Sequence, residues 1–303
     1  MQTGADELTT RARLFLVPTG AGANEPGLLA GPRAIVDALP GRDRLVELVE
    51  PPLDQEFDPH PEHDAYARQH HLIEARALAD VLAPRVAASL EAGERPIVLG
   101  GDHTVAIGAL TGLRLAFGAR RRIGIVWVDA HPDLNTPATT PSNHGHGMPL
   151  SALIGLGHPV LVNAGGVRGP KLSPGDVALV GIRSIDPGEA RLIARHPELH
   201  AITAEQIRSV GLREAVAPVL NWVSELEALH LSFDLDAIDP ADAPGVTTPV
   251  EGGLTADEAQ ELAGLLLATT RLRSADIVEH LPARDRDGKT ARLAASLVHL
   301  LSA

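Results

Sequence analysis

The sequence contains no cysteine, and its 303 residues include only four Phe, two Trp and one Tyr. Without cysteine there is no disulfide framework, no thiolate zinc or iron–sulfur site and no cysteine nucleophile, so any metal must be held by histidine and carboxylate side chains. The chain carries 39 acidic against 26 basic residues, a formal charge of −13. This charge opposes binding to a phosphate backbone, and few rings are present to stack on bases, so we expect no nucleic-acid partner.

Long apolar runs are also missing. The longest stretch free of Asp, Glu, Lys and Arg, residues 134–167, is interrupted by four prolines and by His144, His146 and His158, so it cannot span a bilayer as a helix. The first residues, Met1 to Glu7, are polar and acidic, unlike a secretion signal. We therefore expect a cytoplasmic protein with no membrane partner, and we interpret residues 134–167 as buried or lining a site.

Short apolar runs alternate with longer segments of helical periodicity, which indicates an α/β fold with one parallel sheet covered by helices. No linker-like tract or internal repeat divides the chain, so we expect residues 1–303 to form a single domain. The pattern leaves open whether the sheet is open or closed into a barrel. The expected strands are 14–17, 44–48, 97–99, 123–128, 177–181, 199–202, 229–233 and 274–278. The expected helices are 64–92, 104–117, 187–195, 211–226, 255–268 and 289–301.

Acidic and histidine side chains gather immediately after the expected strands. In both kinds of parallel α/β fold these strand ends meet on the face where sites are built. On an extended chain residues i, i+2 and i+4 point the same way, so Asp129, His131 and Asp133 can face one cavity, and so can Asp234 and Asp236. His103 and Glu279 follow two further strands.

This set of residues predicts a metal site. Four carboxylates packed together repel unless cations lie among them, and two divalent ions would balance their charge. With His103 and His131 the set is rich in oxygen and holds two imidazoles, which suits Mn²⁺ better than zinc. Taken singly, His103 resembles an ordinary turn residue and Asp-Leu-Asp at 234–236 a solvated strand end. Three ionisable groups at the end of a buried strand are costly without a purpose, so the combination favours the metal site.

Three motifs resemble the signatures of the arginase/agmatinase, or ureohydrolase, family. They are Gly-Gly-Asp-His at 100–103, Trp-Val-Asp-Ala-His-Pro-Asp-Leu-Asn-Thr at 127–136 and Ser-Phe-Asp-Leu-Asp-Ala-Ile-Asp-Pro at 232–240. The similarity extends from near Gly31 to the last helical segment, and among family members it is closest in appearance to bacterial arginases. It implies a three-layer α/β/α sandwich with an eight-stranded, mostly parallel sheet, and so favours the open sheet over the barrel.

The resemblance also implies two Mn²⁺ ions and a hydrolytic reaction. The implied ligands are His103, Asp129, Asp133 and Asp234 for one ion, and His131, Asp129, Asp234 and Asp236 for the other. Asp129 and Asp234 would bridge. A hydroxide shared by the ions would attack the guanidinium carbon, because two cations lower the pKa of bound water, and urea and an amine would result.

Further site residues are implied by the same resemblance. His146 matches the family's catalytic histidine, a proton shuttle, and the alternative is a structural histidine. Glu279 matches the acid that pairs with the guanidinium, and the alternative is a capping or surface acid. We expect His146, Asp133 and Glu279 to be the catalytic residues. Thr248 resembles a position near the guanidinium, and an ordinary loop threonine is the alternative. Asp239 is expected to position a loop rather than to bind metal.

The choice of substrate rests on the head-group residues. Asn135 opens the segment that resembles the substrate loop, Thr140 and Ser142 match positions that bind an α-carboxylate, and Asp186 matches the acid that contacts an α-amino group. His144 replaces the usual Asn of this loop; it still donates a hydrogen bond but is bulkier. We therefore expect L-arginine as substrate.

Several alternatives remain at this point. Within the family they are agmatinase, guanidinobutyrase, hydroxyarginine hydrolase and formiminoglutamase, and outside catalysis the alternative is an inactive member. The family also leads us to expect a homo-oligomer, a trimer or a hexamer.

Overall fold

A computed structural model describes residues 11–41, 45–50 and 64–303. Eight strands form one sheet in which every paired neighbour runs parallel. The strands are β1 (Ala12–Val17), β2 (Leu45–Leu48), β3 (Arg95–Gly100), β4 (Ile123–Val128), β5 (Val177–Ile182), β6 (His200–Thr203), β7 (Ala228–Asp234) and β8 (Leu272–Val278). Their order across the sheet is β2-β1-β3-β8-β7-β4-β5-β6, so the sheet is open, as the family resemblance predicts.

The central strands are buried on both faces, and their side chains alternate between two layers. In β4 the side chains of Ile125 and Trp127 enter one apolar cluster, whereas those of Val126 and Val128 enter another. This is the pattern of a strand covered by helices on both sides, where hydrophobic residues occupy successive positions instead of every second one.

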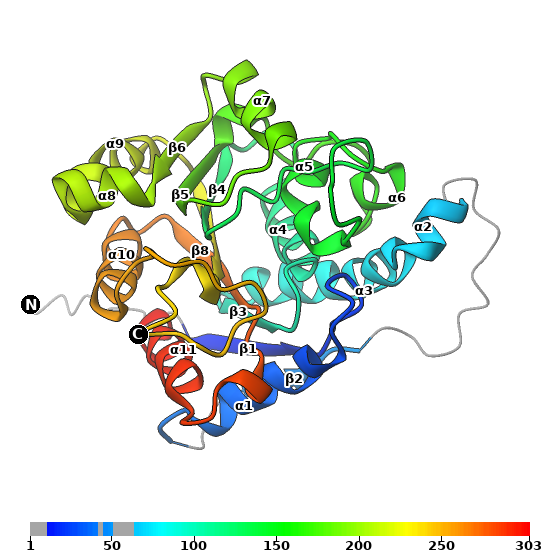
Figure 1. Ribbon diagram of the computed structural model, residues 1–303. Helices are drawn as coiled ribbons and strands as arrows, with labels where there is room; N and C mark the ends of the chain where they lie inside the picture. Colours follow the sequence, from blue (N-terminus) through cyan, green and yellow to red (C-terminus); the bar gives the residue numbers. More distant parts are fainter. Residues whose placement is uncertain (1–10, 42–44, 51–63) are drawn as a thin grey trace, which may run out of the picture.

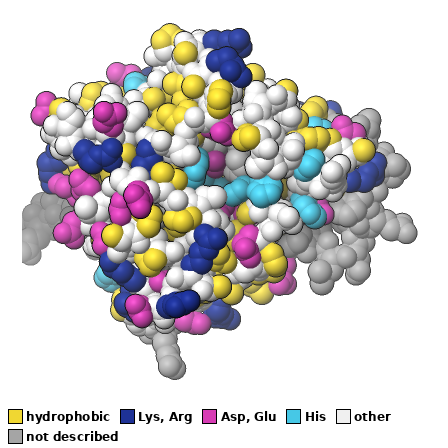
Figure 2. Space-filling view, in the orientation of Figure 1, with side chains coloured by type: hydrophobic (Ala, Val, Ile, Leu, Met, Phe, Trp, Pro, Cys, Tyr) yellow, Lys and Arg dark blue, Asp and Glu magenta, His cyan; other side chains and the backbone are white. Residues whose placement is uncertain are grey.

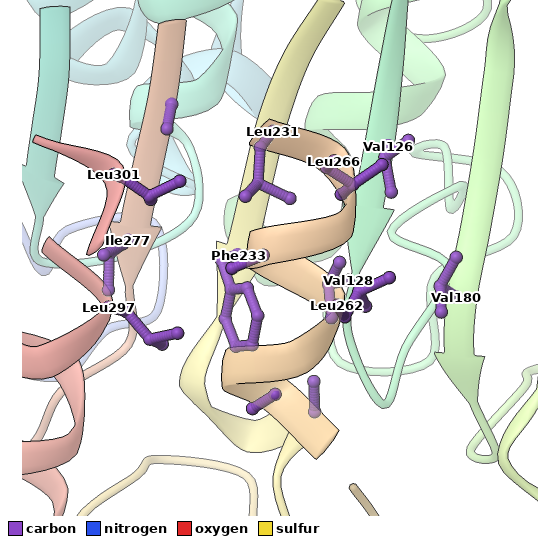
Figure 3. Close-up of a cluster of buried hydrophobic side chains, with 14 of the residues drawn as sticks. Val126, Val128, Val180, Leu231, Phe233, Leu262, Leu266, Ile277, Leu297 and Leu301 are labelled. Atoms are coloured by element: carbon purple, nitrogen blue, oxygen red, sulfur yellow. The ribbon is translucent and has the colours of Figure 1, made fainter. Parts of the chain in front are cut away.

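One helical layer consists of α1 (Gly31–Asp37), α8 (Ala204–Val210), α9 (Leu212–Ser224), α10 (Ala256–Ala268) and α11 (Lys289–Leu301). Figure 3 shows α10 lying across β7 and β4, with Leu262 of the helix beside Val128 and Leu266 beside Val126. Helices α1 and α11 contact each other at the β1–β3 side of this layer. This layer and the sheet together enclose the largest single apolar cluster among the described residues.

The opposite layer consists of α3 (Leu72–Glu91), α4 (Val105–Phe117), α5 (Pro149–Leu153), α6 (Pro159–Val162) and α7 (Pro187–Arg195), and α2 (Ala65–Gln69) precedes α3 (Figure 1). Helix α4 packs on the sheet, and α3 lies against α4. Short 3₁₀ helices complete the chain: η1 (Pro26–Ala30), η2 (Gly145–Gly147), η3 (Pro174–Asp176), η4 (Leu235–Ala237) and η5 (Pro282–Arg284).

One predicted helix is wrong in its extent. The single helix expected over 64–92 is divided at His70 and His71 into α2 and α3, because His71 adopts a left-handed conformation with φ 58°. The part of the chain that the structure describes contains no helix long and apolar enough to cross a membrane.

The strand order places the ends of β3, β8, β7 and β4 next to one another in the middle of the sheet. Strands β3, β1 and β2 form one side of the sheet, and strands β4, β5 and β6 form the other. Strands β8 and β7 lie between the two sides. Ligand sites in open α/β sheets form at the carboxyl ends of strands where the direction reverses. A site is therefore expected at the four central strand ends.

Candidate metal centre

The predicted metal-binding residues come from three of the four central strand ends. His103 lies in the turn after β3, Asp129 follows β4 directly, and Asp234 is the last residue of β7. The turn after β3 needs glycine at position 101, because a Cβ there would lie 1.7 Å from the Thr19 carbonyl oxygen. The same turn is fixed by the buried carboxylate of Asp102, which accepts hydrogen bonds from the backbone N–H groups of Gly22 and Thr104.

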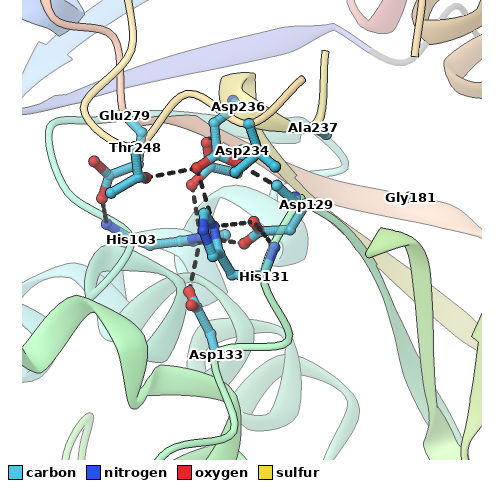
Figure 4. Close-up of polar contacts among 12 residues, drawn as sticks. His103, Asp129, His131, Asp133, Gly181, Asp234, Asp236, Ala237, Thr248 and Glu279 are labelled. Atoms are coloured by element: carbon cyan, nitrogen blue, oxygen red, sulfur yellow. Dashed lines mark hydrogen bonds and ion pairs between the residues drawn. The ribbon is translucent and has the colours of Figure 1, made fainter. Parts of the chain in front are cut away.

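The first group of potential ligands surrounds the imidazole of His103. Its Nδ1 atom lies 3.2 Å from Asp129 Oδ2, 3.2 Å from Asp133 Oδ2 and 3.3 Å from Asp234 Oδ2 (Figure 4). Although the ring is fully buried, this nitrogen has no hydrogen-bond partner. A buried nitrogen that faces three carboxylate oxygens without a hydrogen bond is the arrangement expected around a cation.

The second group lies on the other side of Asp129. His131 Nδ1 is 3.1 Å from Asp236 Oδ2 and 3.4 Å from Asp129 Oδ1. The two oxygens of Asp129 thus face different histidines, Oδ2 toward His103 and Oδ1 toward His131. Two sets of potential ligand atoms, each within 4.8 Å of one another, therefore share Asp129: His103 with Asp129 and Asp234, and Asp129 with His131 and Asp236.

The charges of the cluster also call for cations. Burial raises the pKa of Asp234 and of Asp236, and the neighbouring carboxylates raise both further. Burial together with the charge of Asp129 raises the pKa of Asp133 to about 6. Burial lowers the pKa of His131, but Asp236 and Asp129 outweigh it and bring the pKa to about 12. Divalent cations would replace the protons that otherwise hold such a set of acids together.

Hydrogen bonds hold the carboxylates in place. Asp129 accepts from the indole N–H of Trp127 at 2.9 Å and from the His131 backbone N–H at 2.7 Å. Asp236 accepts from the Ala130 N–H at 3.1 Å and from the hydroxyl of Thr248 at 2.7 Å. The ligand atoms are therefore oriented before any ion arrives.

A second row of buried polar residues lies behind His103. Its Nε2 atom is 2.9 Å from Ser232 Oγ, and Ser232 donates to Asp276 Oδ1 at 2.7 Å. The other oxygen of Asp276 lies 2.7 Å from Nε2 of His230, whose Nδ1 is 2.7 Å from Ser274 Oγ. Such a chain fixes the ring orientation of a metal-ligating histidine and which nitrogen bears its proton.

Glu279 and His146 form a pair beside the metal ligands. Glu279 is fully buried at the end of β8 with a left-handed φ of 68°. Its Oε1 accepts from the His103 backbone N–H at 2.9 Å and lies 3.0 Å from His146 Nδ1, and its Oε2 accepts from the Thr247 hydroxyl. Burial lowers the pKa of His146, but Glu279 outweighs it and brings this pKa to about 9.

The head-group residues lie at the outer part of the site. Asn135 donates to Asp186 Oδ2 at 2.8 Å. The hydroxyls of Thr140 and Ser142 are 3.5 Å apart, and Ser142 Oγ accepts from the His144 backbone N–H at 3.2 Å. Figure 2 shows histidine and acidic side chains side by side in a depression at the centre of this face.

The structure thus brings the six predicted ligands together, sets Glu279 and His146 in contact, and joins Thr248 to Asp236. Asp239 instead accepts from the backbone N–H groups of Ala241, Gly252 and Gly253, and so holds the loop that follows β7. Sequence reasoning missed Thr247 and the row behind His103. The row had a signal: polar residues at every second position of two buried strands, namely His230 and Ser232 of β7 and Ser274 and Asp276 of β8.

The fold and the site define the protein as a parallel α/β protein with a candidate histidine–aspartate metal centre at its middle strand ends. Comparison with known proteins identifies the family. The sequence model of the Arginase family matches residues 10–302. An arginase of Bacillus caldovelox is 41% identical over 218 residues, covering 72% of this chain and 71% of that protein. An arginase of Brevibacillus brevis is 37% identical over 286 residues, 93% and 94% of the two chains.

Solved structures agree with these relatives. The structure of Bacillus caldovelox arginase superposes with a TM-score of 0.85 at 34% identity, over 97% of this chain and 98% of that one. The agmatine ureohydrolase of Thermoplasma volcanium shares the fold, with a TM-score of 0.71 at 22% identity over 97% of this chain and 89% of that one. The chain belongs to the arginase family of ureohydrolases.

Proposed function

We propose that the protein is an arginase that uses two Mn²⁺ ions to hydrolyse L-arginine to L-ornithine and urea. The observation that carries the proposal is the pair of histidine–carboxylate groups joined at Asp129, with buried Glu279 next to them. The 41% identity to an arginase over 72% of the chain supports the choice within the family.

The two ions would be held by six side chains. Oxygen-rich donor sets with imidazole favour Mn²⁺ over zinc, and the chain has no thiolate to offer. When bound, such ions make water a nucleophile near neutral pH and polarise the substrate. The ligands proposed are His103, Asp129, Asp133 and Asp234 for one ion, and His131, Asp129, Asp234 and Asp236 for the other.

Glu279 and His146 are proposed to act on the guanidinium and on the leaving amine. The Glu279 carboxylate is oriented by the His103 N–H and the Thr247 hydroxyl, so it can bind a planar cation through charge-assisted hydrogen bonds. Because the pKa of His146 is raised to about 9, the ring carries a proton at neutral pH that it can give to the departing nitrogen.

The outer residues support an amino-acid head group. The Asp186 carboxylate, fixed by Asn135, suits an α-ammonium group, and the neighbouring hydroxyls of Thr140 and Ser142 suit an α-carboxylate. Agmatine and 4-guanidinobutyrate each lack one of these two charged groups, so they would leave part of this set unpaired. His144 lies beside Ser142, at a position where the family usually has Asn. Comparing the three substrates therefore also tests whether a histidine at this position is compatible with an α-carboxylate.

Urea release tests the proposal. The protein is stripped with a chelator, reloaded with Mn²⁺, and assayed with L-arginine, agmatine and 4-guanidinobutyrate at matched concentrations. We expect metal-dependent release from L-arginine, with kcat/KM at least roughly a hundredfold above the other two. Preference for agmatine would contradict the arginase assignment and leave the metal centre standing, whereas no turnover of any guanidino compound by the metal-loaded protein would contradict both.

The single domain, the cytoplasmic location and the trimeric or hexameric state remain predictions from the sequence. Light scattering on the purified protein measures the oligomer directly. A monomer at micromolar concentration would contradict that prediction.

A further inference from the structure

The loop that follows β7, residues 235–253, holds both Asp236 and the two threonines that contact the acids of the site. One partly buried cation, the guanidinium of Arg183, contacts the backbone of this loop at several points. All six of the hydrogen bonds found for this group go to backbone carbonyls of three separate segments. They are Nε to Val250 and Glu251 at 3.2 Å each, Nη1 to Gly181 and Ala237 at 3.1 Å each, and Nη2 to Asp236 and Val250 at 2.7 Å each.

The backbone of Arg183 contacts the other half of the metal centre. The N–H groups of Arg183 and Ser184 both donate to the Ala130 carbonyl, at 2.9 and 3.0 Å. Ala130 lies between Asp129 and His131, and its own N–H donates to Asp236 Oδ1 at 3.1 Å. One residue of the turn after β5 therefore joins the segment with Asp129 and His131 to the segment with Asp236. In Figure 4, the labels Gly181, in β5, and Ala237, next to Asp236, mark two of the segments whose carbonyls accept hydrogen bonds from Arg183.

The backbone of Gly253 packs directly against the guanidinium. A Cβ on Gly253 would lie 2.6 Å from Arg183 Nη2 and 2.6 Å from the Ala237 carbonyl oxygen. The planar guanidinium makes these contacts with five N–H groups in a fixed fork, whereas a lysine ammonium has three N–H groups and could not reproduce all of them. The contact is thus specific for arginine.

Arg183 also brings a fixed positive charge to the acids. Burial lowers its pKa, whereas attraction from Asp236 and Asp129 opposes that effect. Because the hydrogen bonds go to carbonyls, the charge is not consumed by a direct ion pair and acts on the whole group of carboxylates.

We propose that Arg183 is a positioning residue for the metal position formed by His131 and Asp236. By holding the Asp236 carbonyl and the Ala130 turn, it sets the carboxylate of Asp236, and the Thr248 hydroxyl bound to it, at the distance this position requires. The proposal rests on the binuclear centre proposed above. Loss of the Arg183 side-chain contacts is expected to weaken metal binding at the position of His131 and Asp236 and not at the position of His103.

Calorimetric titration of the chelator-treated protein with Mn²⁺, together with electron paramagnetic resonance of the bound ions, tests this proposal. We expect the R183K variant to bind at one position with roughly 10- to 100-fold lower affinity, while the other stays within about threefold of the parent. The matched control is R208K, because Arg208 donates to the Gly252 carbonyl of the same loop from its exposed side. This control should bind two ions like the parent protein.

Single-ligand backgrounds identify the position that is affected. In H131N the remaining ion is held by the His103 group, and adding R183K should change its affinity by less than about twofold. In H103N the remaining ion is held by the His131 group, and adding R183K should weaken it about tenfold or more. If R183K does not fold, R183Q replaces it, because its shorter amide has only two N–H donors for the same carbonyls, and the same pattern is expected.

Three outcomes would overturn the proposal: unchanged affinity at both positions, an equal loss at both positions, or an equal effect of R183K in the two backgrounds. Failure of the parent protein to bind two ions is a different result, because it would contradict the proposed metal centre itself.

Discussion

At the scale of single residues, the imidazole of His103 has polar neighbours at both nitrogens: Ser232 at Nε2 and three carboxylates at Nδ1. Ser232 links its Nε2 atom to Asp276, and Asp276 is itself held by His230. The ring therefore presents Nδ1 to the carboxylates without freedom to turn. Such outer partners contribute to metal affinity although they never touch the ion.

Asp276→Asn should consequently weaken Mn²⁺ binding and kcat/KM by about 10- to 100-fold, because an amide cannot accept hydrogen bonds at both of its ends. Calorimetric titration with Mn²⁺ and steady-state urea release measure the two effects. Ser274→Ala is the control, since Ser274 contacts only the far nitrogen of His230. Equal effects of the two substitutions would show that these residues contribute through packing and do not orient the His103 ring.

Lys171 gives a residue-scale prediction far from the metal ligands. Its side chain is buried and donates to the Val162 carbonyl, and burial lowers its pKa from 10.5 to about 8. Between these two values the unfolded chain holds a proton that the folded chain has released, so stability rises with pH there, by up to about 3 kcal/mol.

The Lys171→Met variant should lack this rise. Urea unfolding at pH 7.5 and pH 10 compares it with the parent, and Lys289→Met, which changes the only other lysine of the chain, accounts for general alkaline effects. If K171M and the parent protein change in parallel between the two pH values, Lys171 is not titrating as described.

The proposed ligands could be predicted from the sequence because acids and histidines gather just after buried strands. The extended spacing assumed for them does not hold throughout, since Asp133 has a left-handed φ of 50° and Asp236 lies in η4. Glu279 was found only through family resemblance, since one acid after a strand has no distinctive pattern. Thr247 could not have been found, because its contact with Glu279 depends on the path of a loop. Loop paths depend on distant groups such as Arg183, and local pattern does not encode them.

At the scale of elements, two helices begin with the same type of cap but differ in what the cap touches. Thr255 and Glu258 form a reciprocal capping box at the exposed start of α10. At the start of α7, Glu189 accepts from the Asp186 N–H at 2.9 Å and also from the Leu134 N–H at 3.0 Å. The second cap therefore ties a helix to the segment that holds Asp133 and Asn135.

Alanine substitution should separate the two roles. Thr255→Ala is expected to cost about 1 kcal/mol of stability and to leave kcat and KM unchanged. Glu189→Ala should lower stability as well and raise KM for L-arginine by roughly tenfold, since it releases both Asp186 and the chain after Asp133. Chemical denaturation and initial rates check both variants. A Thr255→Ala enzyme with a raised KM would show that capping in general, and not this connection, controls the site.

The elements themselves were largely predictable. All eight strands begin and end within about two residues of their predicted positions, although the predicted start of the second, Arg44, lies outside the described residues. The division of the 64–92 helix was not predicted, because helical periodicity continues through the break. The break is made by a single left-handed residue, His71, and a histidine gives no local warning of that conformation.

At the scale of the whole molecule, part of the negative charge behind the formal value of −13 lies in a buried site. Four of the acids are buried within one small centre, so removing bound cations should destabilise the entire fold. Saturating Mn²⁺ at about a hundred times its dissociation constant should add nearly 3 kcal/mol to the free energy of unfolding.

Thermal unfolding with and without Mn²⁺ measures this stabilisation, and its pH dependence provides a check. In the metal-free protein the raised pKa of Asp133, about 6, means that stability falls as pH rises toward that value. The gain from Mn²⁺ should accordingly shrink below about pH 6, where Asp133 keeps its proton. A melting temperature that ignores Mn²⁺ at neutral pH would contradict the proposed centre.

The strand order was beyond sequence reasoning, and it governs how the molecule is made. The strand latest in sequence, β8, inserts between β3 and β7 and thereby closes the middle of the sheet. A growing chain exposes two unpaired inner edges until residues 272–278 leave the ribosome, and no metal position has its Glu279 neighbour before then. Ion capture and the last step of folding are thereby coupled in time, so a nascent chain cannot begin catalysis before its fold is closed.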